Sequence, residues 1–181
     1  MAPYGYVQLF LFGVLCIGAV IAENATCTNP RALNDIDMDK VYGDWFVGKW
    51  YGPFNFTYDR SRCFSLNITK VNETTFEMIM ETPSTPSSKI FTIEDSENAG
   101  IWFDVDIHRT VQVIYQSADG TAMALAFCVE NETDPALTLL SKQVPVSPEK
   151  IAEFLHAQET AGMLGHNHRF KWDSGATCPS A

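Results

Sequence analysis

The stretch Thr75-Phe76-Glu77-Met78-Ile79-Met80-Glu81-Thr82 decides the fold class, because apolar and polar side chains alternate along most of it. Successive side chains of a β-strand point to opposite faces, so residues two apart share a face. One face consists of Phe76, Met78 and Met80, and the other of Glu77, Ile79 and Glu81. The segment therefore predicts a strand with an apolar face toward a core and a mostly polar face toward water.

Similar short segments recur between Gly43 and Gln143, separated by turn residues. The turn Ser117-Ala118-Asp119-Gly120 lies between two of them, as a hairpin requires. Strands at this spacing predict an all-β antiparallel sandwich or barrel, and the alternation does not distinguish a filled core from a hollow one. The expected strands are residues 63–71, 75–82, 89–93, 101–107, 110–116, 121–130 and 136–142.

The direction of the side chains follows from the same alternation. A glycan on Asn67 must face water, so Phe64, Leu66 and Ile68 are expected to face inward. Segment 121–130 leaves two choices, since either Met123, Leu125 and Phe127 or Ala122, Ala124 and Ala126 could line the interior. In 101–107 the expected inward residues are Ile101, Phe103, Val105 and Ile107, opposed by Trp102, Asp104, Asp106 and His108. The acidic side chains expected to solvate the outer face are Glu77, Glu81, Asp104 and Asp106.

One amphipathic helix is predicted after the strands. Ser147 is a good N-cap, Pro148 suits the first helical position, and Gly162 provides a stop. The apolar stripe Ile151, Phe154 and Leu155 is expected to dock on the outside of the sheet. Residues 166–172 then predict a last short strand.

From Asn34 to Phe46 the sequence resembles the opening of a lipocalin, in which a Gly-x-Trp motif, here Gly43-Asp44-Trp45, begins the first strand. It is most similar to the branch of apolipoprotein D and the insect bilin-binding proteins. Further motifs resemble that branch in the same order, namely Arg62-Cys63 followed by Asn67, Met123-Ala-Leu-Ala-Phe-Cys128, residues 139–149 and the final Cys178. The resemblance implies an eight-stranded antiparallel up-and-down β-barrel, the lipocalin calyx, with one C-terminal α-helix docked outside.

The resemblance also implies a closed base of the barrel, formed by Gly43, Trp45 and Lys142. Lys142 stands where the family has an Arg over the Trp ring, and a Lys can still make a cation–π contact there. Gly48-Lys49-Trp50 is a competing Gly-x-Trp motif, but the distance of Gly43 from Cys27 fits the family better. Ser117-Ala118-Asp119 stands where the family usually has Thr-Asp-Tyr.

The interior is the candidate binding site, because an eight-stranded barrel is wide enough for one small ligand and Met with Phe suits an adaptable apolar pocket. The alternative is that these side chains simply pack together. The resemblance implies a carrier for a small hydrophobic molecule, such as a fatty acid, sterol, retinoid, pheromone-like compound or bile pigment, with no obligatory cofactor. The candidate lining residues are Phe64, Leu66, Phe76, Met78, Met80, Phe103, Val113, Tyr115, Met123, Leu125 and Phe127.

Residues 1–22 predict a secretory signal peptide, because they lack charged side chains, are apolar from Val7 to Ile21 and end on a small residue. Residues 23–181 are then expected to form a single exported domain, without stable membrane insertion. The net charge of −10 argues against nucleic-acid partners. The predicted N-glycosylation sites are Asn24, Asn55, Asn67, Asn72 and Asn131.

Four cysteines remain after the signal, which predicts two disulfides with three alternative connectivities. The resemblance implies the pairs Cys27–Cys128 and Cys63–Cys178. With the thiols bonded and no nucleophile or phosphate-binding motif, we expect no enzyme. His108, His156, His166 and His168 lack companion ligands, so no metal site is expected. The alternative function is a secreted glycoprotein that acts on an unidentified protein partner through loops such as 83–88.

Overall fold

The computed structural model describes residues 30–52, 64–81, 88–96, 100–127, 135–163 and the backbone of 170–173. Strands and helices follow one another in the order expected for alternating hairpins. They are α1 (Met38–Val41), β1 (Gly43–Tyr51), β2 (Ser65–Lys70), β3 (Thr75–Glu81), β4 (Lys89–Asp95), β5 (Ile101–Asp104), β6 (Arg109–Gln116), β7 (Ala122–Phe127), β8 (Ala136–Ser141), α2 (Pro148–Thr160) and β9 (Phe170–Asp173). No helix in these ranges is long and apolar enough to cross a membrane.

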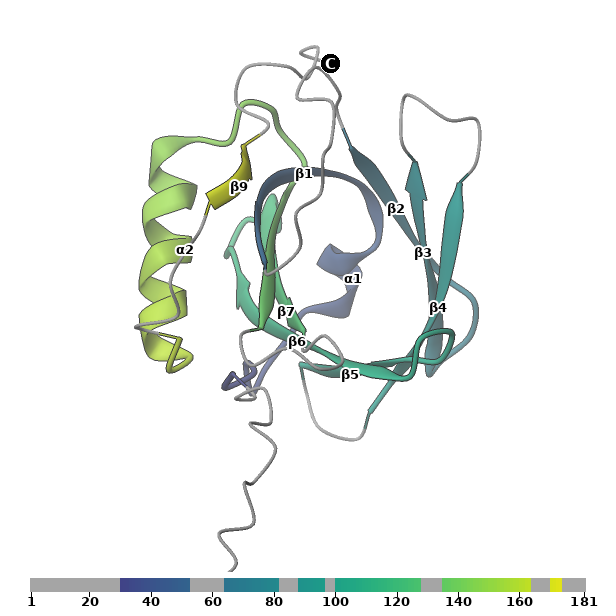
Figure 1. Cartoon of the computed structure of the whole chain (residues 1–181). Coiled ribbons are helices and arrows are strands. Elements are labelled where there is room, and N and C mark those ends of the chain that lie inside the picture. The colour runs from purple at the N-terminus through teal and green to yellow at the C-terminus, as the bar shows by residue number, and fades with distance from the viewer. Residues whose placement is uncertain are drawn as a thin grey trace, which may run out of the picture.

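The strands close into a barrel. Each strand from β2 to β8 pairs antiparallel with the next, and β1 pairs with both β8 and β2. This is a closed eight-stranded up-and-down barrel with a C-terminal helix, so the predicted fold class is confirmed. In Figure 1, α1 lies within the ring outlined by the strands, while α2 stands outside it.

β1 divides its length between partners. Residues Gly43 to Phe46 pair with β2, whereas Phe46 to Tyr51 pair with β8, and the last three residues also pair with β9. The register with β8 shifts between Val47 and Lys49. Such a bulge reverses the alternation of faces. Trp45 and Val47 therefore belong to the barrel interior, and Trp50 packs against that interior after the shift, in place of Lys49.

Two apolar clusters are separated by the sheet. The interior cluster contains Met123, Leu125 and Phe127, whereas Ala122, Ala124 and Ala126 belong to a helix cluster between the barrel wall and α2. The structure thus decides the open choice in β7 in favour of the larger side chains inside. The small alanines face outward, where Phe154 of α2 packs in the same cluster.

α2 begins as predicted, since the Ser147 hydroxyl accepts a hydrogen bond of 3.3 Å from the backbone N–H of Lys150. The helix ends at Thr160, and Gly162 adopts a positive φ of 79° beyond it. One residue of the expected stripe is wrong, because Leu155 is 47% exposed. The buried face holds Phe154, as expected, together with Gln158 four residues later, and Ile151 is partly buried against the same cluster.

The orientation expected for residues 101–107 is wrong. Trp102 and Asp104 are buried, while Phe103 is 38% exposed. β5 ends at Asp104, so Val105 and Ile107 lie in a turn and their alternation carries no information about the strand. The ladder fixes the inward face, because Trp102 lies opposite Val111, a residue of the interior cluster.

Tyr115 is the second wrong lining residue. It belongs to the helix cluster, because the register between β6 and β7 shifts between Val113 and Tyr115. An irregularity of this kind turns the following side chain to the other face. Val113 therefore lies inside the barrel and Tyr115 outside, although they are two residues apart.

Candidate ligand site in the barrel

The base of the barrel is built around Trp45, which is fully buried. Its indole N–H donates a 2.7 Å hydrogen bond to the backbone oxygen of Val41, the last residue of α1. The Lys142 ammonium lies 4.7 Å from the centroid of the Trp45 ring. The structure thus places Trp45 and Lys142 together, with Gly43 at a φ of 108° that favours glycine at the start of β1.

α1 is held across this end of the barrel by two further contacts. The Lys142 ammonium donates hydrogen bonds to the backbone oxygens of Lys40, at 3.1 Å, and Tyr42, at 3.3 Å. The Gln116 amide at the end of β6 exchanges two 2.9 Å hydrogen bonds with the backbone of Asp37. The sequence pattern missed α1, because four residues are too short for a helical period to show.

The interior walls contain most of the predicted lining residues. Those buried in the interior cluster are Phe64, Leu66, Phe76, Met78, Val113, Met123, Leu125 and Phe127, and Met80 is half-buried against it. Phe103 and Tyr115 lie elsewhere, as described above. Interior residues that were not singled out as lining include Val47, Ile68, Phe91, Ile93, Trp102 and Val111. Ile68 is expected to face inward from the alternation of its strand. For the others the deciding signal is the register of pairing between strands, which a single strand's alternation does not reveal.

Aromatic side chains interlock within this interior. The rings of Phe76 and Trp102 meet edge to face with centroids 4.9 Å apart, and Tyr42 approaches Phe76 at 6.4 Å from the base. Elsewhere in the interior the ring centroids of Trp50 and Phe127 lie 5.4 Å apart. The second Gly-x-Trp motif therefore also contributes its Trp to the interior, with Gly48 closely approached by the side chain of Val146 outside.

The buried polar atoms of interior residues that have no hydrogen-bond partner in the described part of the chain include the indole nitrogen of Trp102 and the hydroxyl of Thr138. Thr138 lies on the same face of β8 as Ala136 and Leu140, which both belong to the interior cluster. It lies opposite Leu125 on β7 and Trp50 on β1. A buried polar group left unpaired costs about 1–3 kcal/mol, so each calls for a partner.

Charged side chains meet at the opposite end from α1, where β5 ends and β6 begins; we call this end the mouth. Arg109 Nε lies 3.3 Å from Asp104 Oδ2, an ion pair without an aligned hydrogen bond at Nε. The Arg109 guanidinium carbon lies 4.0 Å from the centroid of Phe127. Burial lowers the pKa of Arg109 and Asp104 opposes that shift, so Arg109 stays protonated. The prediction that Asp104 faces water is wrong, because its pairing with Ile93 turns it inward.

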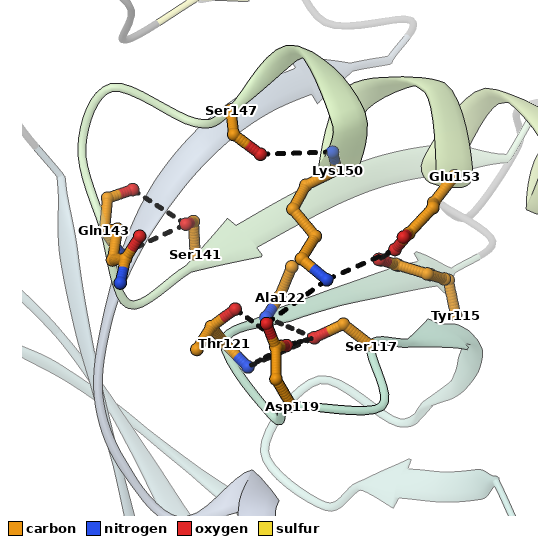
Figure 2. A network of polar contacts seen from close by, with 10 residues as sticks. All are labelled: Tyr115, Ser117, Asp119, Thr121, Ala122, Ser141, Gln143, Ser147, Lys150 and Glu153. Atoms are coloured by element: carbon orange, nitrogen blue, oxygen red, sulfur yellow. Dashed lines mark hydrogen bonds and ion pairs between the residues drawn. The ribbon is translucent and has the colours of Figure 1, made fainter.

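The turn after β6 is held together by hydrogen bonds between its own side chains. The Ser117 hydroxyl donates to Asp119 at 2.6 Å, and Thr121 donates to the same carboxylate from its hydroxyl at 2.8 Å (Figure 2). The Ser117 and Thr121 hydrogen bonds hold the pKa of Asp119 below its usual value. Lys150 of α2 lies 3.3 Å from Asp119, which ties the turn to the helix.

Tyr115 makes the second tie to α2. Its hydroxyl donates to the carboxylate of Glu153, which also pairs with Lys150 at 3.4 Å (Figure 2). Burial, followed by the neighbouring Glu153, raises the pKa of Tyr115. This residue, predicted to line the interior, therefore fastens the helix to the outside of the barrel.

Several predictions fall outside the described residues. These are the signal peptide, the glycosylation sites Asn24, Asn55 and Asn131, the loop 83–87, the histidines His166 and His168, and the cysteines Cys27, Cys63, Cys128 and Cys178. Asn67 lies on the outer face of β2, where its amide donates to Asp44 at 2.7 Å, and Asn72 is exposed in the β2–β3 turn. Within the described ranges, no three His, Cys or acidic residues gather as metal ligands.

The barrel with its external C-terminal helix is a lipocalin fold. Neither protein-family models nor curated protein sequences match the chain. Among solved structures the chain is similar to the siderocalin Ex-FABP, described as functioning through dual ligand specificities, with a TM-score of 0.56 and 17% identity. The similarity covers 78% of this chain and 95% of that one. At this identity it shows the fold alone.

Proposed function

We propose that this protein is a secreted carrier or sequestering protein that binds one small hydrophobic molecule inside the barrel. The observation that carries the proposal is the pair of buried, partnerless polar atoms on Trp102 and Thr138 among otherwise apolar interior residues. An apolar ligand with one or two oxygen atoms would satisfy them while covering the Met and Phe side chains. The lipocalin fold supports the same function.

The proposal also covers the location, covalent modifications and family branch of the protein. Export by the signal at residues 1–22, glycosylation and the two disulfides suit an extracellular carrier, and we assign the chain to the apolipoprotein D-like branch on its motifs. The proposal includes no catalytic step. The candidate ligands are fatty acids, sterols, retinoids, pheromone-like compounds and bile pigments.

Native mass spectrometry of the deglycosylated protein from its own source, with organic extraction of the bound material, tests the proposal directly. We expect one apolar molecule per chain. Complete absence of any extractable ligand, together with failure of the wild type to bind an apolar fluorophore, would show a close-packed interior. The alternative function, recognition of a protein partner by the loops, would then replace the carrier hypothesis.

A matched pair of variants locates the site. Met78→Lys places a charge on the interior face, whereas Phe103→Lys places it on the exposed face two strands away. We expect Met78→Lys to abolish fluorophore binding and Phe103→Lys to retain it, with circular dichroism showing both to be folded. Equal loss in both variants, or equal retention, would contradict an interior site.

A further inference from the structure

The ion pair at the mouth combines one deeply buried charge with one accessible charge. The Asp104 side chain is 1% exposed and that of Arg109 is 25% exposed. Both residues lie on the interior face, since they are ladder partners and Asp104 also faces Ile93. A ligand that reaches the mouth would therefore meet the Arg109 guanidinium, with the Asp104 carboxylate behind it.

The pair is fixed in place by its surroundings. Asp104 Oδ1 accepts a 3.3 Å hydrogen bond from the backbone N–H of Ile107. The turn ends at His108, whose φ of 51° is uncommon for a residue other than glycine. Phe127 covers one face of the guanidinium. The charges are therefore held before any ligand arrives, which is the condition for selective recognition.

Arg109 keeps hydrogen-bonding capacity for a ligand. A guanidinium has five N–H donors, and Asp104 lies nearest to the one at Nε, at 3.3 Å. Its positive charge, by contrast, is already balanced by Asp104. The mouth thus offers N–H donors without net charge.

We propose that this subsite selects apolar ligands that end in a neutral oxygen, such as an alcohol or a carbonyl, over ligands that end in a carboxylate. A neutral oxygen accepts from Arg109 without further charge. A carboxylate would bring a second negative charge beside Asp104 with a single cation between them, in an interior that screens charges weakly. The inference rests on the proposed function and specifies its ligand class.

Retinol and retinoate form a matched probe pair that differs at the terminal oxygen group. We expect the wild type at neutral pH to bind retinol at least about tenfold more tightly, measured by quenching of tryptophan fluorescence. Asp104→Asn keeps the shape and leaves Arg109 uncompensated, so retinoate should gain affinity until the preference shrinks or reverses. Glu77→Gln, on the outer face of β3, is the control and should leave the ratio unchanged.

The double variant Asp104→Asn/Arg109→Gln guards against a folding artefact, because it leaves no unpaired charge. It should lose the gain in retinoate affinity that the single variant shows. Retinoate binding as tight as retinol in the wild type, or an unchanged ratio in Asp104→Asn, would overturn the subsite alone. Binding of neither probe by the wild type would overturn the proposed function, and the subsite with it.

Discussion

Lys142 places its ammonium 4.7 Å from the centroid of the Trp45 ring while it donates hydrogen bonds to the backbone oxygens of Lys40 and Tyr42. One side chain after β8 thereby joins α1 and the start of β1. The Trp45 indole completes the connection through Val41. The base of the barrel is thus closed by a connected set of polar contacts around a buried ring.

Lys142→Met should lower the free energy of unfolding by about 1–3 kcal/mol, because two backbone oxygens lose their partner and the cation–π contact disappears. Urea denaturation followed by circular dichroism measures the change. Lys142→Arg preserves charge and donors and should retain most of the stability. A Met variant as stable as the wild type would mean that the ammonium contributes nothing to the base.

Trp45→Ala should destabilise the protein by about 3–5 kcal/mol, as large aromatic truncations in cores do. Trp50→Ala should cost clearly less, since Trp50 is partly buried and packs on the edge of the interior cluster. Thermal unfolding of the two variants compares them. The reverse order would show that the second Gly-x-Trp motif, and not the first, carries the base.

Asp119 makes the free energy of unfolding depend on pH. Its pKa is lowered in the folded state by Ser117 and Thr121, so its contribution is present above the ordinary value of about 3.9 and is lost as pH falls through the lowered value. Asp119→Asn should therefore be less stable than the wild type at neutral pH. The difference in melting temperature should shrink below about pH 4. A difference that stays constant well below that pH would exclude this carboxylate as the cause.

The disulfides stay a prediction from the family resemblance. Proteolysis without reduction should release one peptide pair joining Cys27 to Cys128 and another joining Cys63 to Cys178. Removal of either bond should cost about 2–5 kcal/mol. Any other pairing, or free thiols, would count against the apolipoprotein D-like branch.

The fold could be predicted from the sequence because its determinants are local. Alternation in 75–82 and the cap at Ser147 each act within a few residues and indicate strands followed by one helix, while the choice of a closed barrel came from the family resemblance, which begins at the Gly43-x-Trp45 motif. The inward face of β7 could not be predicted from its own sequence, since the side chains on both faces of this strand are apolar. It is decided by α2, whose Phe154 packs in the cluster of the three alanines.

The candidate site was predicted less completely, for a different reason. Phe103 and Tyr115 were placed inside by alternation, but a short strand and a shift of register reverse them. A strand ending and a bulge are set by pairing with neighbours, which a single segment does not encode. The Asp104–Arg109 pair was missed for the same reason, because only the ladder brings these two residues together on the inner face.

The division of β1 between its partners also bears on self-association. β2 takes its first half and β9 the last three residues, so the sheet ends in a strand of only four residues. An exposed sheet edge is a template on which a strand of another molecule can add, and short edge strands suppress that process. A chain with so many strand-forming segments would otherwise be at risk of polymerising. We therefore expect the folded protein to stay monodisperse when concentrated.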